Sequence, residues 1–114
     1  MAQVPMSLMQ GTVDLLILKA LQHEPSHGYA ISRFVRARTD GLLTLEDAAL
    51  YQALHRLEAR GLVEAEWGLS ENNRRARFYR PTPDGRRRLK ADTANWRQYA
   101  AAIFRVLDEP EGAK

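Results

Sequence analysis

The sequence predicts a single, mainly α-helical domain with one small β-hairpin and a long last helix. Three segments with helical apolar spacing come first, two short strand-like segments around a turn-rich stretch follow, and a segment with a seven-residue apolar repeat comes last. The chain has 114 residues, of which 45% are hydrophobic and none is cysteine. This composition suits one compact domain and excludes a disulfide framework.

The first two helices are expected in residues 12–21 and 26–38. Thr12 and Ser26 are the candidate N-caps, because a hydroxyl oxygen can accept a hydrogen bond from a backbone N–H of the first turn. Gly41 follows the second segment and is expected to end it. The first segment is apolar on nearly every side, so other structure has to cover more than one of its faces. We expect its own domain to cover one face and a second subunit to cover another.

A third helix is expected to begin at a capping pair formed by Thr44 and Asp47 and to run to Arg60, before Gly61. Three leucines spaced i, i+4, i+7 should face the core. These are Leu50, Leu54 and Leu57. The opposite, exposed side is free of carboxylates and consists of Ala48, Tyr51, Gln52, His55, Arg56 and Ala59.

A β-hairpin is expected next. Residues 62–67 and 76–80 have strand composition, and the segment between them holds Gly, Ser and two Asn. The tip of the hairpin is expected at residues 71–75. Phe78 and Tyr79 are neighbours in the second strand, so one of the two should pack inward.

The last helix is expected to begin at the N-cap Thr82, with Pro83 in the first helical position, and to run to about Leu107. Its apolar repeat is formed by Leu89, Trp96 and Ile103, which are seven residues apart. A helix of roughly 25 residues is about 37 Å long, which is longer than a domain of this size can cover. Part of its apolar seam is therefore expected to face a second subunit.

Positive charge is concentrated in one segment. Residues 74–90 carry a net charge of +7, whereas the remaining residues sum to −4. A local cluster of cations on an otherwise acidic chain is what a polyanion-binding surface requires, because local attraction orients the partner. A solvated, charged turn and helix start would have the same composition, so the position of the segment in the fold has to decide.

The order of three helices, a hairpin and a long helix is that of a winged helix-turn-helix with a dimerising tail. The sequence resembles the PadR family of transcriptional regulators, in its short type with a single C-terminal helix. The resemblance rests on the order of residues 11–18 (GTVDLLIL), 27–31 (HGYAI), 50–51 (LY), 54–63 (LHRLEARGLV) and 73–85 (NRRARFYRPTPDG). The sequence departs from the family at residues 48–52, where relatives usually have Gly-Ser-Leu-Tyr-Pro and this chain has AALYQ.

The third helix is the expected DNA reader, because an α-helix fits the major groove of B-DNA. Gln52 points away from the core and its amide can form paired hydrogen bonds with adenine. The small side chain of Ala48 lets the start of the helix approach closely. Tyr51 and Arg56 are better placed for phosphates, and His55 is either a base reader or a bystander.

The hairpin is the expected wing. Its basic side chains, with the amides of Asn72 and Asn73, are expected to follow a phosphate backbone or to enter the minor groove. They are Arg74, Arg75 and Arg77. An alternative for Arg77 is a pairing with Glu64 or Glu66 across the strands, which would make it structural. Tyr29 is expected on the surface near DNA.

A second site is expected between subunits. The resemblance implies that the last and first helices of two subunits enclose an apolar space, where aromatic side chains stack on planar ligands. Trp96 is the candidate for such stacking, and the small Ala100 leaves room beside it; the alternative is that Trp96 only fills the dimer core. The residues assigned to this effector pocket or dimer interface are Leu15, Leu18, Leu89, Trp96, Tyr99, Ala100, Ile103, Phe104 and Leu107.

Enzymatic and membrane functions are not expected. His23, His27 and His55 lack the spacing of metal ligands, no nucleophile motif is present, and no cofactor is predicted. His27 is read as part of a helix start, in which Gly28 lets a neighbouring element approach closely. The apolar runs are too short to span a bilayer, and the first ten residues lack the features of a signal peptide, which favours the cytoplasm.

The functional hypothesis is a homodimeric regulator of double-stranded DNA: a repressor at an inverted-repeat operator, released by an apolar or aromatic small molecule. Residues 1–81 are expected to bind DNA, residues 82–108 to dimerise, and residues 109–114 to form a disordered tail. The alternative is a winged-helix protein-interaction module without DNA binding. The basic segment disfavours this alternative, because protein interface cores are depleted of charged residues.

Overall fold

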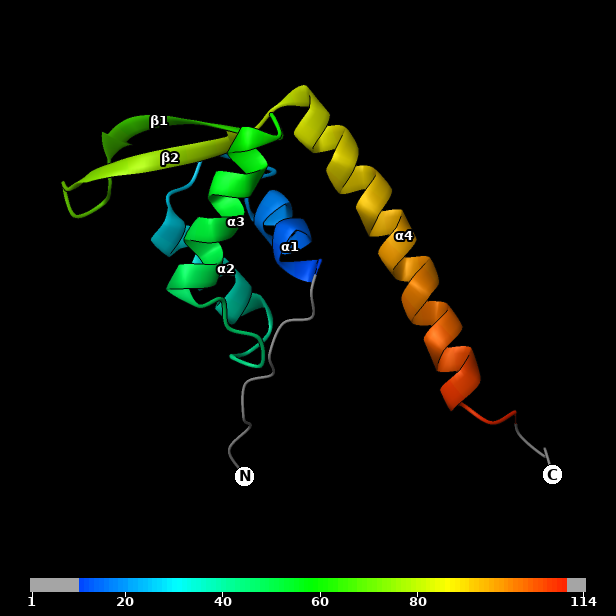
Figure 1. Cartoon of the computed structure of the whole chain (residues 1–114). Helices are drawn as coiled ribbons and strands as arrows, with labels where there is room; N and C mark the ends of the chain where they lie inside the picture. The colour runs from blue at the N-terminus through cyan, green and yellow to red at the C-terminus, as the bar shows by residue number, and fades with distance from the viewer. Residues whose placement is uncertain (1–10, 111–114) are drawn as a thin grey trace.

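Four helices and one two-stranded antiparallel sheet follow one another along the residues that the structure describes, 11–110 (Figure 1). The structure is a computed structural model. The elements are α1 (Thr12–Ala20), α2 (Gly28–Arg38), α3 (Asp47–Ala59), β1 (Val63–Leu69), β2 (Arg75–Pro81) and α4 (Pro83–Leu107). This order confirms the predicted fold class. Residues 1–10, and residues 111–114 of the predicted tail, lie outside the described residues.

The second helix begins one residue later than the predicted cap implies. The backbone of Ser26 pairs with Tyr79 of β2 instead, through hydrogen bonds of 3.0 and 2.9 Å. His27 is the N-cap, and its Nδ1 atom accepts a hydrogen bond from the N–H of Ala30 at 3.3 Å. The prediction of Ser26 is wrong because a contact with a strand far along the chain holds its backbone outside the helix.

The third helix begins without the predicted capping pair of Thr44 and Asp47. Glu46 occupies the N-cap position with an extended backbone, and it forms no side-chain cap hydrogen bond. The buried Leu45 just before it accepts a hydrogen bond at its carbonyl from Ser32 Oγ, at 3.0 Å. This contact with α2 holds the chain extended up to Glu46, so the helix starts too late for Thr44 to cap it.

Glycines mark three of the helix boundaries. Gly11 precedes α1 as its N-cap, so Thr12 is the first helical residue and not the cap that was expected. Gly41 and Gly61 follow α2 and α3 with φ angles of 80° and 72°. Glycine adopts this left-handed backbone at low cost, and both helices end there as predicted.

The core lies between α1, the inner sides of α2 and α3, and the base of the hairpin. Ile17 and Leu18 of α1 are fully buried in it. The predicted leucine stripe of α3 is buried as well: Leu50, Leu54 and Leu57. Tyr79 is buried and Phe78 is only partly so, which confirms that one of the two packs inward.

Helix α4 is attached tightly to the corner between α3 and β1. Thr82 is its N-cap as predicted, accepting a hydrogen bond at Oγ1 from Gly85 N–H at 3.0 Å. The same hydroxyl donates to the carbonyl of Gly61 at 2.6 Å, and the backbone N–H of Thr82 donates to Leu62 at 3.1 Å. A Cβ atom on Gly85 would lie only 2.0 Å from the Leu62 carbonyl oxygen. We call these four residues the α4 joint.

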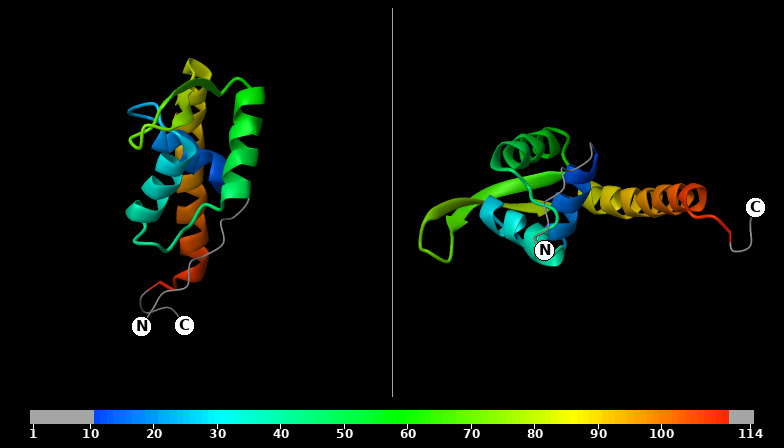
Figure 2. Two further views of the ribbon diagram at one scale, coloured as in Figure 1. Left: turned by 90° about the vertical axis from the view of Figure 1, so that its left-hand side faces the viewer. Right: turned by 90° about the horizontal axis from the view of Figure 1, so that it is seen from below.

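The hairpin and α4 project from opposite sides of the helical part (Figure 2). The molecule accordingly measures 61 × 38 × 22 Å. Leu89, near the start of α4, is buried in the core. The later apolar side chains of α4 are exposed in the single chain: Trp96, Tyr99, Ile103, Phe104, Val106 and Leu107.

Candidate nucleic-acid interface

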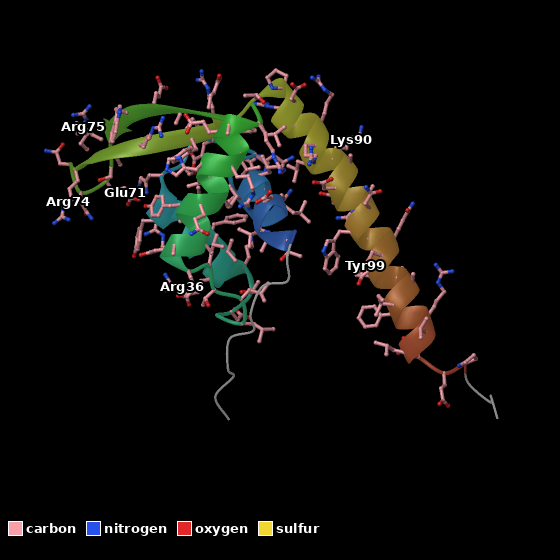
Figure 3. All side chains as sticks on the ribbon, in the orientation of Figure 1. Arg36, Glu71, Arg74, Arg75, Lys90 and Tyr99 are labelled. Atoms are coloured by element: carbon pink, nitrogen blue, oxygen red, sulfur yellow. The ribbon has the colours of Figure 1, made fainter. Side chains whose placement is uncertain are left out.

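A groove of about 880 Å³ lies between the start of α2, the outer side of α3 and the hairpin, which we call the wing. Its walls are basic and aromatic: Tyr29 and Arg33 come from α2, Tyr51 and His55 from α3, and Trp67, Arg74, Arg75 and Arg77 from the wing. One carboxylate, that of Glu71, lines it too. Figure 3 shows Arg74, Arg75 and Glu71 around the wing tip. Such a combination of cations and flat rings suits the phosphates and sugars of a nucleic acid.

The outer side of α3 is exposed, as the leucine stripe requires. Ala48, Gln52 and His55 are exposed, and all three lie on the side away from the core. Gln52 is near the start of the helix and has the longest neutral polar side chain of the three. The structure therefore brings the predicted reading residues to one surface, next to the groove.

Tyr51 of α3 packs against the start of α2. A Cβ atom at Gly28 would lie 2.5 Å from the Tyr51 hydroxyl oxygen, so only glycine permits this approach. The expectation that Gly28 lets a neighbouring element come close is confirmed. Tyr51 stays 47% exposed, and with Tyr29 it lines the groove.

Two of the predicted DNA-contacting arginines have carboxylate partners within the chain. Arg56 on α3 contacts Asp14 of α1, with 2.6 Å between Nη2 and Oδ1. Arg77 on β2 contacts Glu58 of α3, with 2.9 Å between Nη2 and Oε2. Both pairs tie elements of the domain together, so part of the hydrogen-bonding capacity of each arginine is used within the chain.

The alternative pairing of Arg77 across the strands is wrong. In the register of the hairpin, Arg77 lies opposite Trp67, and Glu64 lies opposite Arg80. Arg80 takes Glu64 as its partner, at 2.9 Å. Glu66 lies opposite Phe78, on the other face of the sheet from Arg77. The structural partner of Arg77 is thus on α3 and not on the neighbouring strand.

Sequence reasoning missed several side chains that line the groove, two of which are Arg33 and Trp67. Arg33 lies 5.4 Å from the centre of the Tyr29 ring and 3.4 Å from Glu71 of the wing tip, so it links α2 with the wing. Its position four residues after Tyr29 on one helix face is the signal that could have found it. The second is Trp67, which strand alternation places on the same face as Arg77 and Tyr79 once the register is known.

The predicted second site is formed only in part within one chain. A pocket of about 330 Å³ is lined by Gly11, Thr12, Leu15, Asp92, Asn95, Trp96 and Tyr99. The rings of Trp96 and Tyr99 meet edge to face, with their centres 6.5 Å apart. Ala100, Ile103, Phe104 and Leu107 lie on α4 outside this pocket.

Two residues assigned to the second site are buried already in the single chain. Leu18 is 0% exposed and Leu89 is 7% exposed, because both belong to its core.

Other kinds of site are not seen in the part of the chain that the structure describes. No group of three or more His, Asp or Glu side chains within residues 11–110 is arranged to hold a metal ion. None of the helices in this range is long and apolar enough to cross a membrane.

Three helices, a two-stranded wing and a basic groove between them define a winged-helix fold of the DNA-binding type. The model of the transcriptional regulator PadR-like family matches residues 17–91. The chain belongs to this family of transcriptional regulators.

Solved structures and one curated protein are similar over most of the chain. A transcriptional regulator from Clostridium thermocellum is 33% identical, with 87% of this chain and 93% of that chain covered and a TM-score of 0.79. A PadR family transcription regulator from Clostridium difficile is 27% identical, with 86% and 100% covered and a TM-score of 0.75. An uncharacterized protein from Lysinibacillus sphaericus is 27% identical over 101 residues, 89% of each chain.

Proposed function

We propose that the chain is a repressor that binds an inverted-repeat operator as a homodimer. The observation that carries this proposal is the groove, because it places the exposed side of α3 next to wing cations. Arg74 and Arg75 at the wing tip are exposed, and no ion pair involves either of them among residues 11–110. Helix α3 supplies base contacts through Gln52, and the wing supplies phosphate contacts.

The dimer is supported by the uncovered apolar seam of α4. Side chains such as Phe104 and Leu107 are 60% and 67% exposed in the single chain, which is costly for a row of large apolar groups in water. A second copy of the same helix offers the matching seam. Residues 82–108 then hold two DNA-binding parts, residues 1–81 of each chain, at a fixed spacing.

The release step uses the pocket beside Trp96. Its aromatic pair and the apolar Leu15 suit a flat, apolar or aromatic small molecule. A ligand there changes the spacing of the two α3 helices only if it binds one arrangement of the dimer more tightly than the other.

Footprinting on the DNA that flanks the gene tests the proposal. We expect protection of two half-sites about one helical turn apart, near 34 Å centre to centre. The variant R74A/R75A serves as a control, because it leaves α3 intact and removes two unpaired cations. Protection of a single half-site would contradict the dimer, and no protection of any duplex would favour the alternative of a protein-interaction module. The +7 charge of residues 74–90 argues against that alternative.

A further inference from the structure

Side chains on the groove-facing side of the wing are buried at its base and exposed farther toward its tip. At the base, Val63 and Tyr79 are buried against the core. Farther out on the same face, Trp67 is 58% exposed although it is a large aromatic side chain. Because it covers little of the core, burial does not explain the presence of an indole ring at this position.

Trp67 lies under a basic side chain of the neighbouring strand. The guanidinium carbon of Arg75 is 4.5 Å from the centre of the Trp67 ring, which is a cation–π contact. Arg75 is paired with Leu69 in the register, so it is the diagonal neighbour of Trp67 on one face of the hairpin. Arg77, directly opposite Trp67, is bound to Glu58 instead. The indole face is therefore available to Arg75.

The contact with Trp67 leaves Arg75 able to form hydrogen bonds. A guanidinium has five N–H donors, and the indole ring offers no oxygen or other strong acceptor that would occupy them. Arg75 takes part in no ion pair among the described residues 11–110, so no carboxylate occupies these donors. A phosphate can then bind the edge of the guanidinium without breaking the stack.

We propose that Trp67 is a positioning residue for DNA binding: it holds the Arg75 guanidinium on the groove side of the wing, ready to donate to a phosphate. This inference rests on the proposed function. An exposed arginine loses many rotamers when it binds a partner, and the stack removes part of that loss beforehand. The gain expected from an exposed cation–π contact is about two- to fivefold in affinity.

The test measures the affinity of the full chain for a fluorescently labelled, mixed-sequence DNA duplex by anisotropy over a range of salt concentrations. We expect Trp67→Ala to weaken binding about two- to fivefold and to keep the wild-type salt slope, because the charge of Arg75 remains. Arg75→Ala should weaken binding more and reduce the slope by about one. Trp67→Phe keeps an aromatic face and should restore most of the affinity.

Leu69→Ala is the matched control. Leu69 is on the same strand and face as Trp67 and is 65% exposed, but it offers no aromatic ring. Its truncation should leave both affinity and salt slope unchanged. A loss equal to that of Trp67→Ala would mean that any large side chain here supports the wing, and it would overturn the inference.

The double variant W67A/R75A decides whether Trp67 acts through Arg75. If it does, the double variant binds no more weakly than Arg75→Ala alone. Losses that multiply would show that Trp67 contacts DNA itself, and an undiminished affinity of Trp67→Ala would show that the stack has no function. Either result overturns the inference.

NMR of the free wild-type chain tests the contact between Arg75 and Trp67 directly. It needs neither DNA nor a substituted protein. The ring current of Trp67 should shift the side-chain protons of Arg75 upfield relative to those of Arg74. Unshifted Arg75 protons in a chain that binds the duplex would overturn this inference and leave the proposed function standing. A chain with shifted protons that binds no duplex would overturn both.

Discussion

Gly28→Ala tests whether the contact between α2 and Tyr51 shapes the DNA-binding side of α3. A Cβ atom at Gly28 would lie 2.5 Å from the Tyr51 hydroxyl oxygen, and ordinary contact begins at 3.4 Å, so the tyrosine has to move. Alanine favours a helix over glycine by up to about 1 kcal/mol. Forcing a side chain off its rotamer costs about 0.5–1.5 kcal/mol. The two effects oppose each other, so the free energy of unfolding should change by less than about 1 kcal/mol.

The affinity for DNA should fall more clearly than the stability of Gly28→Ala. In the proposed complex the Tyr51 hydroxyl donates a hydrogen bond to a phosphate, and displacing it removes this bond, which is worth about 0.5–1.5 kcal/mol. Urea denaturation and anisotropy with an operator duplex measure the two quantities. Tyr51→Ala provides the matched background, in which the obstacle is absent and Gly28→Ala should stabilise by up to about 1 kcal/mol. Equal stabilisation in both backgrounds, or an unchanged affinity of the single variant, would refute the reasoning.

Three other substitutions address the reading helix, the wing and the dimer. Gln52→Ala should cost roughly 1–3 kcal/mol on the operator and little on mixed-sequence DNA; equal losses in anisotropy would indicate a phosphate contact instead. Arg74→Ala should weaken binding to all sequences alike and flatten the salt slope by about one unit, and a changed sequence preference would show that the wing reads bases. Ile103→Glu should give monomers or insoluble protein in light scattering, whereas Ala102→Glu on another side of α4 should not; a dimer that survives Ile103→Glu would contradict the α4 seam.

Local signals in the sequence predicted much of the fold. Thr82 followed by Pro83 fixes the start of α4, because a cap and its helix lie within four residues of each other. The leucine stripe of α3 predicted both its buried side and the exposed side that carries Gln52. The Gly and Asn residues of the hairpin placed the turn correctly, since turn chemistry is local as well.

Most of the wrong predictions concern contacts between distant segments. Ser26 has the right chemistry for a cap, but its backbone is held by Tyr79, and no local pattern reports such a bridge. The partner of Arg77 is nineteen positions away on α3, and only the packing of the hairpin against that helix selects Glu58. The core position of Leu18 could not be separated from an interface position either, because the first helix is apolar on several sides and tertiary packing decides which side is covered.

The α4 joint attaches α4 rigidly to the DNA-binding part, so the two move as one body. No linker separates the wing from this helix, and the contact of Gly85 with the Leu62 carbonyl leaves no slack for bending at its base. When helix and domain rotate together by about 5°, the far end of the 25-residue helix moves by roughly 3 Å. In the proposed dimer, a small molecule can push the far ends of the two α4 helices apart by that distance. Both DNA-binding parts then rotate, and neither of them changes its internal structure. The coupling is reciprocal: bound DNA fixes the positions of the two DNA-binding parts and so lowers the affinity for the small molecule. The rigid α4 joint transmits the effect in both directions.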